Sequence, residues 1–118
     1  MTDSADRLQP VDSLTIDVLT DDVSDAYVSK TMFAVSEFAN VVNGGARAIS
    51  GETLLLGNLG LGLRLTVTYG GHTRRLLFDT GPEGGVFLRN CRNLGICLGD
   101  VEYIAITHGP WDHMGALL

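Results

Sequence analysis

The chain has 118 residues, a formal net charge of −6 and a hydrophobic content of 45%. This length is typical of one domain, and the apolar fraction suffices for a buried core, so wholesale disorder is excluded. The acidic balance disfavours a protein that binds a phosphate backbone, because such binding needs clustered Lys and Arg side chains. We therefore expect no nucleic-acid partner.

The cysteines and the hydropathy pattern bear on the compartment. Cys91 and Cys97 form neither a CxxC motif nor a disulfide framework, so we expect two reduced thiols. The first residues do not combine a basic segment with an apolar one, and no uncharged apolar run reaches the roughly 18 residues of a membrane span. These features predict a cytoplasmic protein with no membrane partner.

The first elements are predicted from hydrophobic periodicity. Residues 1–13 are mostly polar and are expected to form a flexible leader, so the domain is expected to span residues 14–118. The alternation of apolar and polar side chains from Leu14 to Val18 predicts a half-buried strand. Residues 24–43 group their apolar side chains near a helical period, but their β-branched residues leave helix and ordered loop equally open.

The next segment contains many glycines, so we expect it to be rich in turns. Gly57, Gly60 and Gly62 have neither the order nor the strand-to-helix setting of a dinucleotide-binding loop, so they are predicted to be turn or bulge glycines. Residues 63–69 then alternate cleanly, and Gly70-Gly71 follows as a two-residue turn. The pattern predicts an antiparallel hairpin.

The second strand of that hairpin is expected over residues 72–79, with His72 solvated at the turn and without a functional role. A short helix is predicted over residues 84–94 and ends at Gly95, with Cys91 on its buried face. Residues 101–107 are β-rich with few polar positions, which predicts an interior strand covered on both faces.

Candidate chemistry follows the predicted strands. Asp79 ends one of them, and His108, Asp112 and His113 lie directly after the next. Imidazole nitrogens and carboxylate oxygens are the donors that zinc accepts, and a compact loop can bring several of them together. Spacing alone leaves two other interpretations open: His108 as a surface histidine, and Asp112 as the cap of a helix beginning near Met114.

The amino-acid sequence of these loops is more specific than the spacing of their His and Asp residues. Thr-His-Gly-Pro-Trp-Asp-His-Met-Gly at 107–115 resembles the His-x-His-x-Asp-His signature of the metallo-beta-lactamase superfamily, and Asp-Thr-Gly at 79–81 resembles its preceding element. Within that superfamily, residues 76–117 are most similar to the subgroup described as dihydropterin synthases of the methanopterin pathway. The resemblance extends from about Leu63 to the C-terminus.

The resemblance implies an α/β (α+β) fold that forms the N-terminal half of an αββα sandwich, with one or two Zn²⁺ ions (or Mn²⁺ or Fe²⁺) at one edge. It implies that His108 binds the first metal, that Asp112 and His113 bind the second, and that Asp112 also serves catalysis by orienting the metal-bound water. Asp79 is implied to hold the loops by hydrogen bonds without binding metal. The implied reaction is attack of this water on an ester, phosphodiester or lactone bond of a small-molecule substrate.

Two departures from the family pattern affect the expected activity. Pro110 stands where the family has its second histidine, and the family's remaining ligands lie farther along the chain than Leu118. We therefore expect an N-terminal fragment of a metal-dependent hydrolase that is inactive by itself. The alternative is a non-catalytic remnant of the fold that acts as an interaction domain. A closed Cys/His zinc site is disfavoured, because it needs four converging donors.

Overall fold

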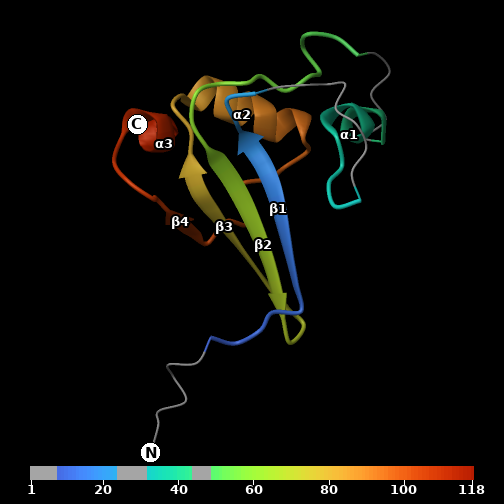
Figure 1. Ribbon diagram of the computed structural model, residues 1–118, viewed down its shortest axis with the longest axis vertical. Helices are drawn as coiled ribbons and strands as arrows, with labels where there is room; N and C mark the ends of the chain where they lie inside the picture. The colour runs from blue at the N-terminus through green and yellow to red at the C-terminus, as the bar shows by residue number, and fades with distance from the viewer. Residues whose placement is uncertain (1–7, 24–31, 44–48) are drawn as a thin grey trace, which may run out of the picture.

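The computed structural model describes residues 8–23, 32–43 and 49–118. Within them one mixed sheet has the strand order β1-β2-β3-β4, and the fold class is α+β, as predicted (Figure 1). The elements in chain order are β1 (Ser13–Thr20), α1 (Glu37–Asn43), β2 (Gly62–Tyr69), β3 (His72–Thr80), α2 (Gly84–Asn93), β4 (Tyr103–Ala105), α3 (Trp111–Met114) and the 3-10 helix η2 (Gly115–Leu117).

The central hairpin forms where the sequence predicts it. β2 and β3 pair antiparallel, and Tyr69 lies opposite His72 across the turn. Gly70 and Gly71 have φ values of 55° and 80°, a left-handed pair that glycine adopts without a steric penalty. His72 is exposed at this turn, far along β3 from Asp79.

β1 completes the antiparallel part of the sheet by pairing with β2. β1 begins at Ser13, one residue before the expected start of the domain at residue 14: Ser13 pairs with Thr68, and the Asp12 carboxylate accepts a 2.7 Å hydrogen bond from the Gly70 N–H. Residues 1–7 of that leader lie outside the described residues.

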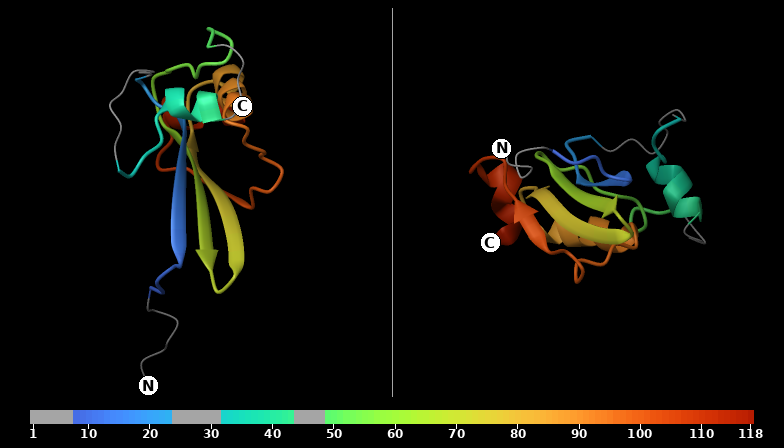
Figure 2. Two further views of the ribbon diagram at one scale, coloured as in Figure 1. Left: turned by 90° about the vertical axis from the view of Figure 1, so that its right-hand side faces the viewer. Right: turned by 90° about the horizontal axis from the view of Figure 1, so that it is seen from below.

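The two faces of the sheet differ in what covers them. α2 packs against one face (Figure 2), where its buried side chains Phe87 and Cys91 form a core with Leu19 and Leu77. On this same face, two guanidinium nitrogens of Arg64 lie 2.9 Å from one carboxylate oxygen of Asp17. The ion pair satisfies two charges that are partly withdrawn from water beside the core.

The opposite face carries apolar side chains that the described residues leave partly exposed. Leu14, Ile16 and Val18 of β1 point to it, and their exposed fractions are 52%, 52% and 46%. Register places each of them opposite an apolar residue of β2, so the stripe continues across the sheet. Among the described residues, no helix packs over this stripe as α2 packs over the other face.

Helix α2 begins and ends as its flanking residues predict. Glu83 is the N-cap, and its carboxylate accepts a 3.1 Å hydrogen bond from the Gly85 N–H. At the other end Gly95 has φ 68°, and the Ile96 N–H bonds the Cys91 carbonyl, which together form a Schellman motif. None of the helices in the described ranges has the length and apolar character needed to cross a bilayer.

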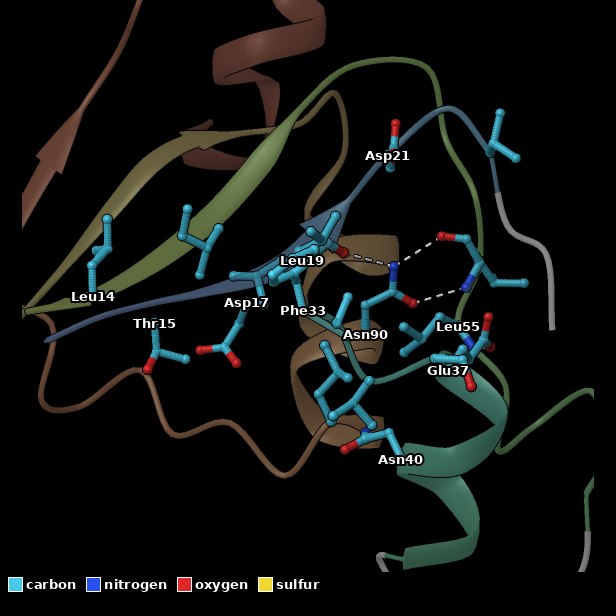
Figure 3. Close-up of a pocket in the computed structure, with 18 residues that line it drawn as sticks. Leu14, Thr15, Asp17, Leu19, Asp21, Phe33, Glu37, Asn40, Leu55 and Asn90 are labelled. Carbon is cyan, nitrogen blue, oxygen red and sulfur yellow. Dashed lines mark hydrogen bonds between the residues drawn. The ribbon is translucent and has the colours of Figure 1, made fainter. Parts of the chain in front are cut away.

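A buried amide ties α2 to two distant segments. The Asn90 side chain is 1% exposed; its Nδ2 donates to the carbonyls of Leu19 and Leu56, and its Oδ1 accepts from the Leu56 N–H, all at 2.9 Å (Figure 3). The sequence showed no sign of this role. Because an asparagine amide supplies both donors and an acceptor, it satisfies backbone groups that no strand partner reaches.

The glycine-rich region and its flanks are only partly described. Of the predicted helix or loop over 24–43, residues 24–31 lie outside the described residues, and α1 forms the C-terminal part. Gly60 has φ 126°, and the β2–β3 register shifts by one residue beside Gly62, so these two glycines do occupy turn and bulge positions as predicted.

The prediction of an interior strand over 101–107 is wrong. β4 comprises three residues, lies at the sheet edge parallel to β3, and leaves Tyr103 65% and Ile104 49% exposed. Its pairing with β3 ends at Phe78, the residue directly before the bulge in β3. The Thr107 N–H then bonds a side chain of β3 in place of a strand carbonyl.

The two thiols are expected to differ sharply in reactivity. Cys91 is 3% exposed, and burial raises the pKa of its thiol to about 11, so little thiolate forms at about pH 8. Cys97 is exposed. A colorimetric thiol reagent should modify one cysteine rapidly in the folded chain and the other only on unfolding. Cys97→Ser should remove the rapid phase and Cys91→Ser should leave it; rapid loss of Cys91 thiol would contradict the packing.

Removal of the Asn90 amide should destabilise the fold. Asn90→Ala leaves two carbonyls and one N–H buried without these partners, which is expected to lower the free energy of unfolding by about 2–4 kcal/mol. Asn93→Ala is the matched control, because Asn93 bonds the Glu52 and Leu54 carbonyls from a less buried position and should cost about 1 kcal/mol. Urea denaturation measures both; equal midpoints would refute the bridging role.

Candidate functional site

Asp79 occupies a β-bulge at the end of β3. Gly62 pairs with Thr80 and Leu63 pairs with Phe78, so Asp79 is the extra residue between them. Its φ is 57°, the one positive value on a non-glycine residue in the described part of the chain, and Asp tolerates this conformation better than most residues. The Asp79 side chain is 0% exposed at this bulge.

The buried Asp79 carboxylate is hydrogen-bonded by residues of the 107–113 loop. Its Oδ1 accepts from the Thr107 N–H at 2.8 Å, and its Oδ2 accepts from the Thr107 hydroxyl at 2.7 Å. The same Oδ2 lies 2.7 Å from Nδ1 of His113. Burial alone raises the pKa of Asp79, but these hydrogen bonds from Thr107 and His113 outweigh it and hold the pKa below its ordinary value.

Thr107 also connects this carboxylate to His108. Its hydroxyl oxygen lies 2.9 Å from Nδ1 of His108. The rings of His108 and His113 are neighbours, with centroids 4.2 Å apart and planes inclined at 50°. Two imidazoles are thus held side by side, and the Nδ1 atom of each already has a partner.

Asp112 lies in the first turn of α3, beside His113. One of its carboxylate oxygens is 3.5 Å from Nε2 of His113. Helix α3 begins at Trp111, earlier than the predicted start at Met114, and its N-cap is Pro110, with no side-chain cap bond. The interpretation of Asp112 as a helix cap is therefore wrong, and its carboxylate remains available beside the ring.

Close backbone packing holds α3 in place. A Cβ at Gly60 would lie 2.0 Å from the Asp112 carbonyl oxygen, and a Cβ at Gly115 would lie 2.1 Å from the Pro82 carbonyl oxygen. The Thr80 hydroxyl donates to the His113 carbonyl at 3.3 Å. Only glycine permits these approaches, so the loops around residues 60 and 82 determine where Asp112 and His113 lie.

The donors match a divalent metal in kind but not in number. His108 and His113 each retain Nε2, and Asp112 adds a carboxylate, which are ligand types that zinc accepts. In the described ranges, however, no three or more His, Cys, Asp or Glu side chains form a group that could hold a metal ion. Within the described ranges, the 107–113 loop therefore brings together ligand types that zinc accepts without forming a complete metal-binding group.

The sequence prediction missed the part played by Thr107. The predicted residues Asp79, His108, Asp112 and His113 do gather at one end of β3, but Thr107 is what joins Asp79 to His108. Its position directly before His108, with a hydroxyl at the end of a β-rich run, was the available signal. Only the folded loop shows that this hydroxyl turns toward β3.

A groove of about 950 Å³ lies elsewhere, along the free edge of β1 and beside α1 (Figure 3). Leu14, Leu19, Phe33 and Leu55 are among its apolar lining residues, and Asp21 and Glu37 add acidic groups. None of the four predicted site residues lines it. The groove and the 107–113 loop are therefore separate features.

The comparisons with known proteins leave the chain without an assigned family. Its sequence matches no protein-family model and no curated protein. The resemblance to the metallo-beta-lactamase superfamily therefore remains a hypothesis that rests on the residues themselves.

Replacing the buried carboxylate by an amide should reverse the protonation pattern of His113. In Asp79→Asn the amide oxygen keeps the Thr107 N–H bond, which places the NH₂ group where Oδ2 lies and makes it a donor toward Nδ1 of His113. A neutral His113 ring must then carry its proton on Nε2. NMR of the imidazole nitrogens measures this change, with His72 as internal reference; a ring that keeps its proton on Nδ1 would contradict the geometry.

Proposed function

We propose that this chain is the N-terminal part of a metal-dependent hydrolase of the metallo-beta-lactamase superfamily. The observation that carries the proposal is the contact between the buried Asp79 carboxylate and Nδ1 of His113 at 2.7 Å. Histidines that bind metals commonly donate their other ring N–H to a carboxylate, which fixes the ring and makes the free nitrogen more basic. His113 has this arrangement, with Nε2 left toward Asp112.

His108 supports the same interpretation. Its Nδ1 is engaged by the Thr107 hydroxyl at 2.9 Å, so Nε2 is the nitrogen left to bind a ligand. The ring is exposed, which gives an ion access from solvent. We assign His108 to a first metal, and Asp112 and His113 to a second.

A bound Zn²⁺, Mn²⁺ or Fe²⁺ would supply a water of lowered pKa and polarise the bond under attack. Asp112, besides holding the second ion, would orient this water by hydrogen bonding. Asp79 stays ionised behind His113 and keeps that ring in position. The bond broken would be an ester, phosphodiester or lactone in a small-molecule substrate.

The uncovered apolar face of the sheet supports the view that a further layer belongs to this fold. Two sheets stack face to face through alternating apolar side chains, and Leu14, Ile16 and Val18 present such a stripe. We propose that this face meets the second sheet of an αββα sandwich. We also propose a cytoplasmic location, in agreement with two free cysteines.

Pro110 favours a second candidate function, a non-catalytic remnant that serves as an interaction domain. Pro110 is exposed, lacks any donor atom in its side chain, and stands where the resembling family has a histidine. Its φ and ψ of −67° and 153° suit any residue, and it is the N-cap of α3, so its missing N–H breaks no intrahelical bond. The backbone would therefore accept a histidine at this position.

Zinc titration of the purified chain tests the metal proposal. We expect Zn²⁺ to bind, with His113→Ala weakening the affinity roughly tenfold or more, because one imidazole and its anchored geometry are lost. His72→Ala is the matched control, since His72 is an exposed histidine at the far end of β3 and should bind no zinc. Equal affinities of the wild type and His113→Ala would refute the assignment.

Two further variants separate the hydrolase from the remnant. In a longer protein that contains this chain, Asp112→Ala should abolish metal-dependent hydrolysis. Full activity of that variant would contradict the role proposed for Asp112. Pro110→His should tighten zinc binding if the loop is a working metal site with one ligand missing. No gain in affinity or turnover from Pro110→His would favour the remnant.

A further inference from the structure

We propose that Thr107 is a positioning residue: its hydroxyl joins Asp79 to His108 and thereby determines which ring nitrogen of His108 carries the proton. The inference deepens the proposed function and rests on it for its chemical purpose, which is to leave Nε2 of His108 free for a metal. The hydrogen-bond geometry itself is independent of any metal. The positioning role of Thr107 and the proposed metal-dependent function are therefore refuted by different results.

The direction of the hydrogen bonds follows from a count of protons. The Thr107 hydroxyl has one proton and two near neighbours: Oδ2 of Asp79 at 2.7 Å and Nδ1 of His108 at 2.9 Å. A carboxylate only accepts, so the hydroxyl proton points to Asp79. The hydroxyl oxygen is then an acceptor toward His108, and Nδ1 of that ring must donate.

The hydroxyl is held in this orientation by a second bond from the same residue. The Thr107 N–H donates to Oδ1 of Asp79 at 2.8 Å, so the main chain and the side chain of Thr107 together hydrogen-bond both oxygens of this carboxylate. The branched Cβ of threonine further restricts rotation about χ1. His108 is thus tied to a buried group, although its own ring is exposed.

One carboxylate oxygen consequently sets the protonation of both rings. Oδ2 of Asp79 meets Nδ1 of His113 directly and Nδ1 of His108 through Thr107. Both neutral rings carry their proton on Nδ1, and both Nε2 atoms have a free electron pair. The ring centroids are 4.2 Å apart, so the metal-free chain already holds two neighbouring imidazoles whose Nε2 atoms can act as ligands.

Two substitutions at Thr107 separate the hydroxyl from the shape of the side chain. Thr107→Val keeps the branched shape and the main-chain bond to Asp79 but removes the hydroxyl, whereas Thr107→Ser keeps the hydroxyl. The readout is NMR of the imidazole nitrogens in the metal-free chain, with His72 as internal reference. His113 reports on the integrity of the loop, because its own bond to Asp79 does not pass through Thr107.

We expect the Val variant to shift His108 from the Nδ1–H form toward the Nε2–H form that imidazole favours in water, while His113 keeps its proton on Nδ1. The Ser variant should retain the wild-type form of both rings. If His108 stays Nδ1–H in Thr107→Val with His113 unchanged, the proposed role of Thr107 is overturned. If the Val variant unfolds, an Nε2–H His108 in the Ser variant or in the wild type overturns it equally.

Zinc titration of the same proteins connects the result to the proposed function. Thr107→Val should weaken Zn²⁺ binding roughly tenfold or more, and Thr107→Ser should restore it, because partners of metal-ligating histidines have effects of this size. A shift of the His108 proton in a chain that binds no zinc at all would uphold the role of Thr107 and refute the metal proposal. Unchanged zinc affinity in the Val variant would refute the link between them.

Discussion

The carboxylate of Asp79 is the interaction on which the whole loop end of the sheet depends. It is fully buried, and a buried charge is costly unless hydrogen bonds replace the water it has lost. Thr107 and His113 supply those bonds, so the 107–113 loop cannot move away without exposing an unpaired charge to an apolar interior. The same bonds that stabilise the fold also orient the imidazoles. The Asp79 carboxylate therefore contributes both to stability and to the geometry of the candidate site.

The bulge in β3 explains how a strand residue comes to serve a loop. The extra residue gives Asp79 a left-handed backbone at the end of β3, where its buried carboxylate bonds the 107–113 loop. The last residue of β3 that pairs with β4 is Phe78, directly before this bulge. The end of the β3–β4 pairing and the buried carboxylate therefore lie at neighbouring positions of β3, next to the bulge opposite Gly62.

Sequence reasoning succeeded where neighbouring residues decide the conformation. The hairpin at Gly70-Gly71, the limits of α2 and the burial of Cys91 follow from spacings of two to four residues and from glycine at left-handed positions. It failed at β4 and at the start of α3, where the outcome depends on segments far along the chain. Asn90 belongs to the same class, because its partners Leu19 and Leu56 lie in other elements.

The sequence by itself determined the α+β class, the hairpin, helix α2 and the presence of two histidines and two carboxylates at the ends of predicted strands. Only the tertiary structure decided that Asp79 is buried in a bulge and that Thr107 turns its hydroxyl toward it. The physical reason is separation: the bonds to Asp79 span 28 residues from Thr107 and 34 from His113. Local propensity carries no information about such partners, which meet only after the sheet and the glycine-lined loops have packed.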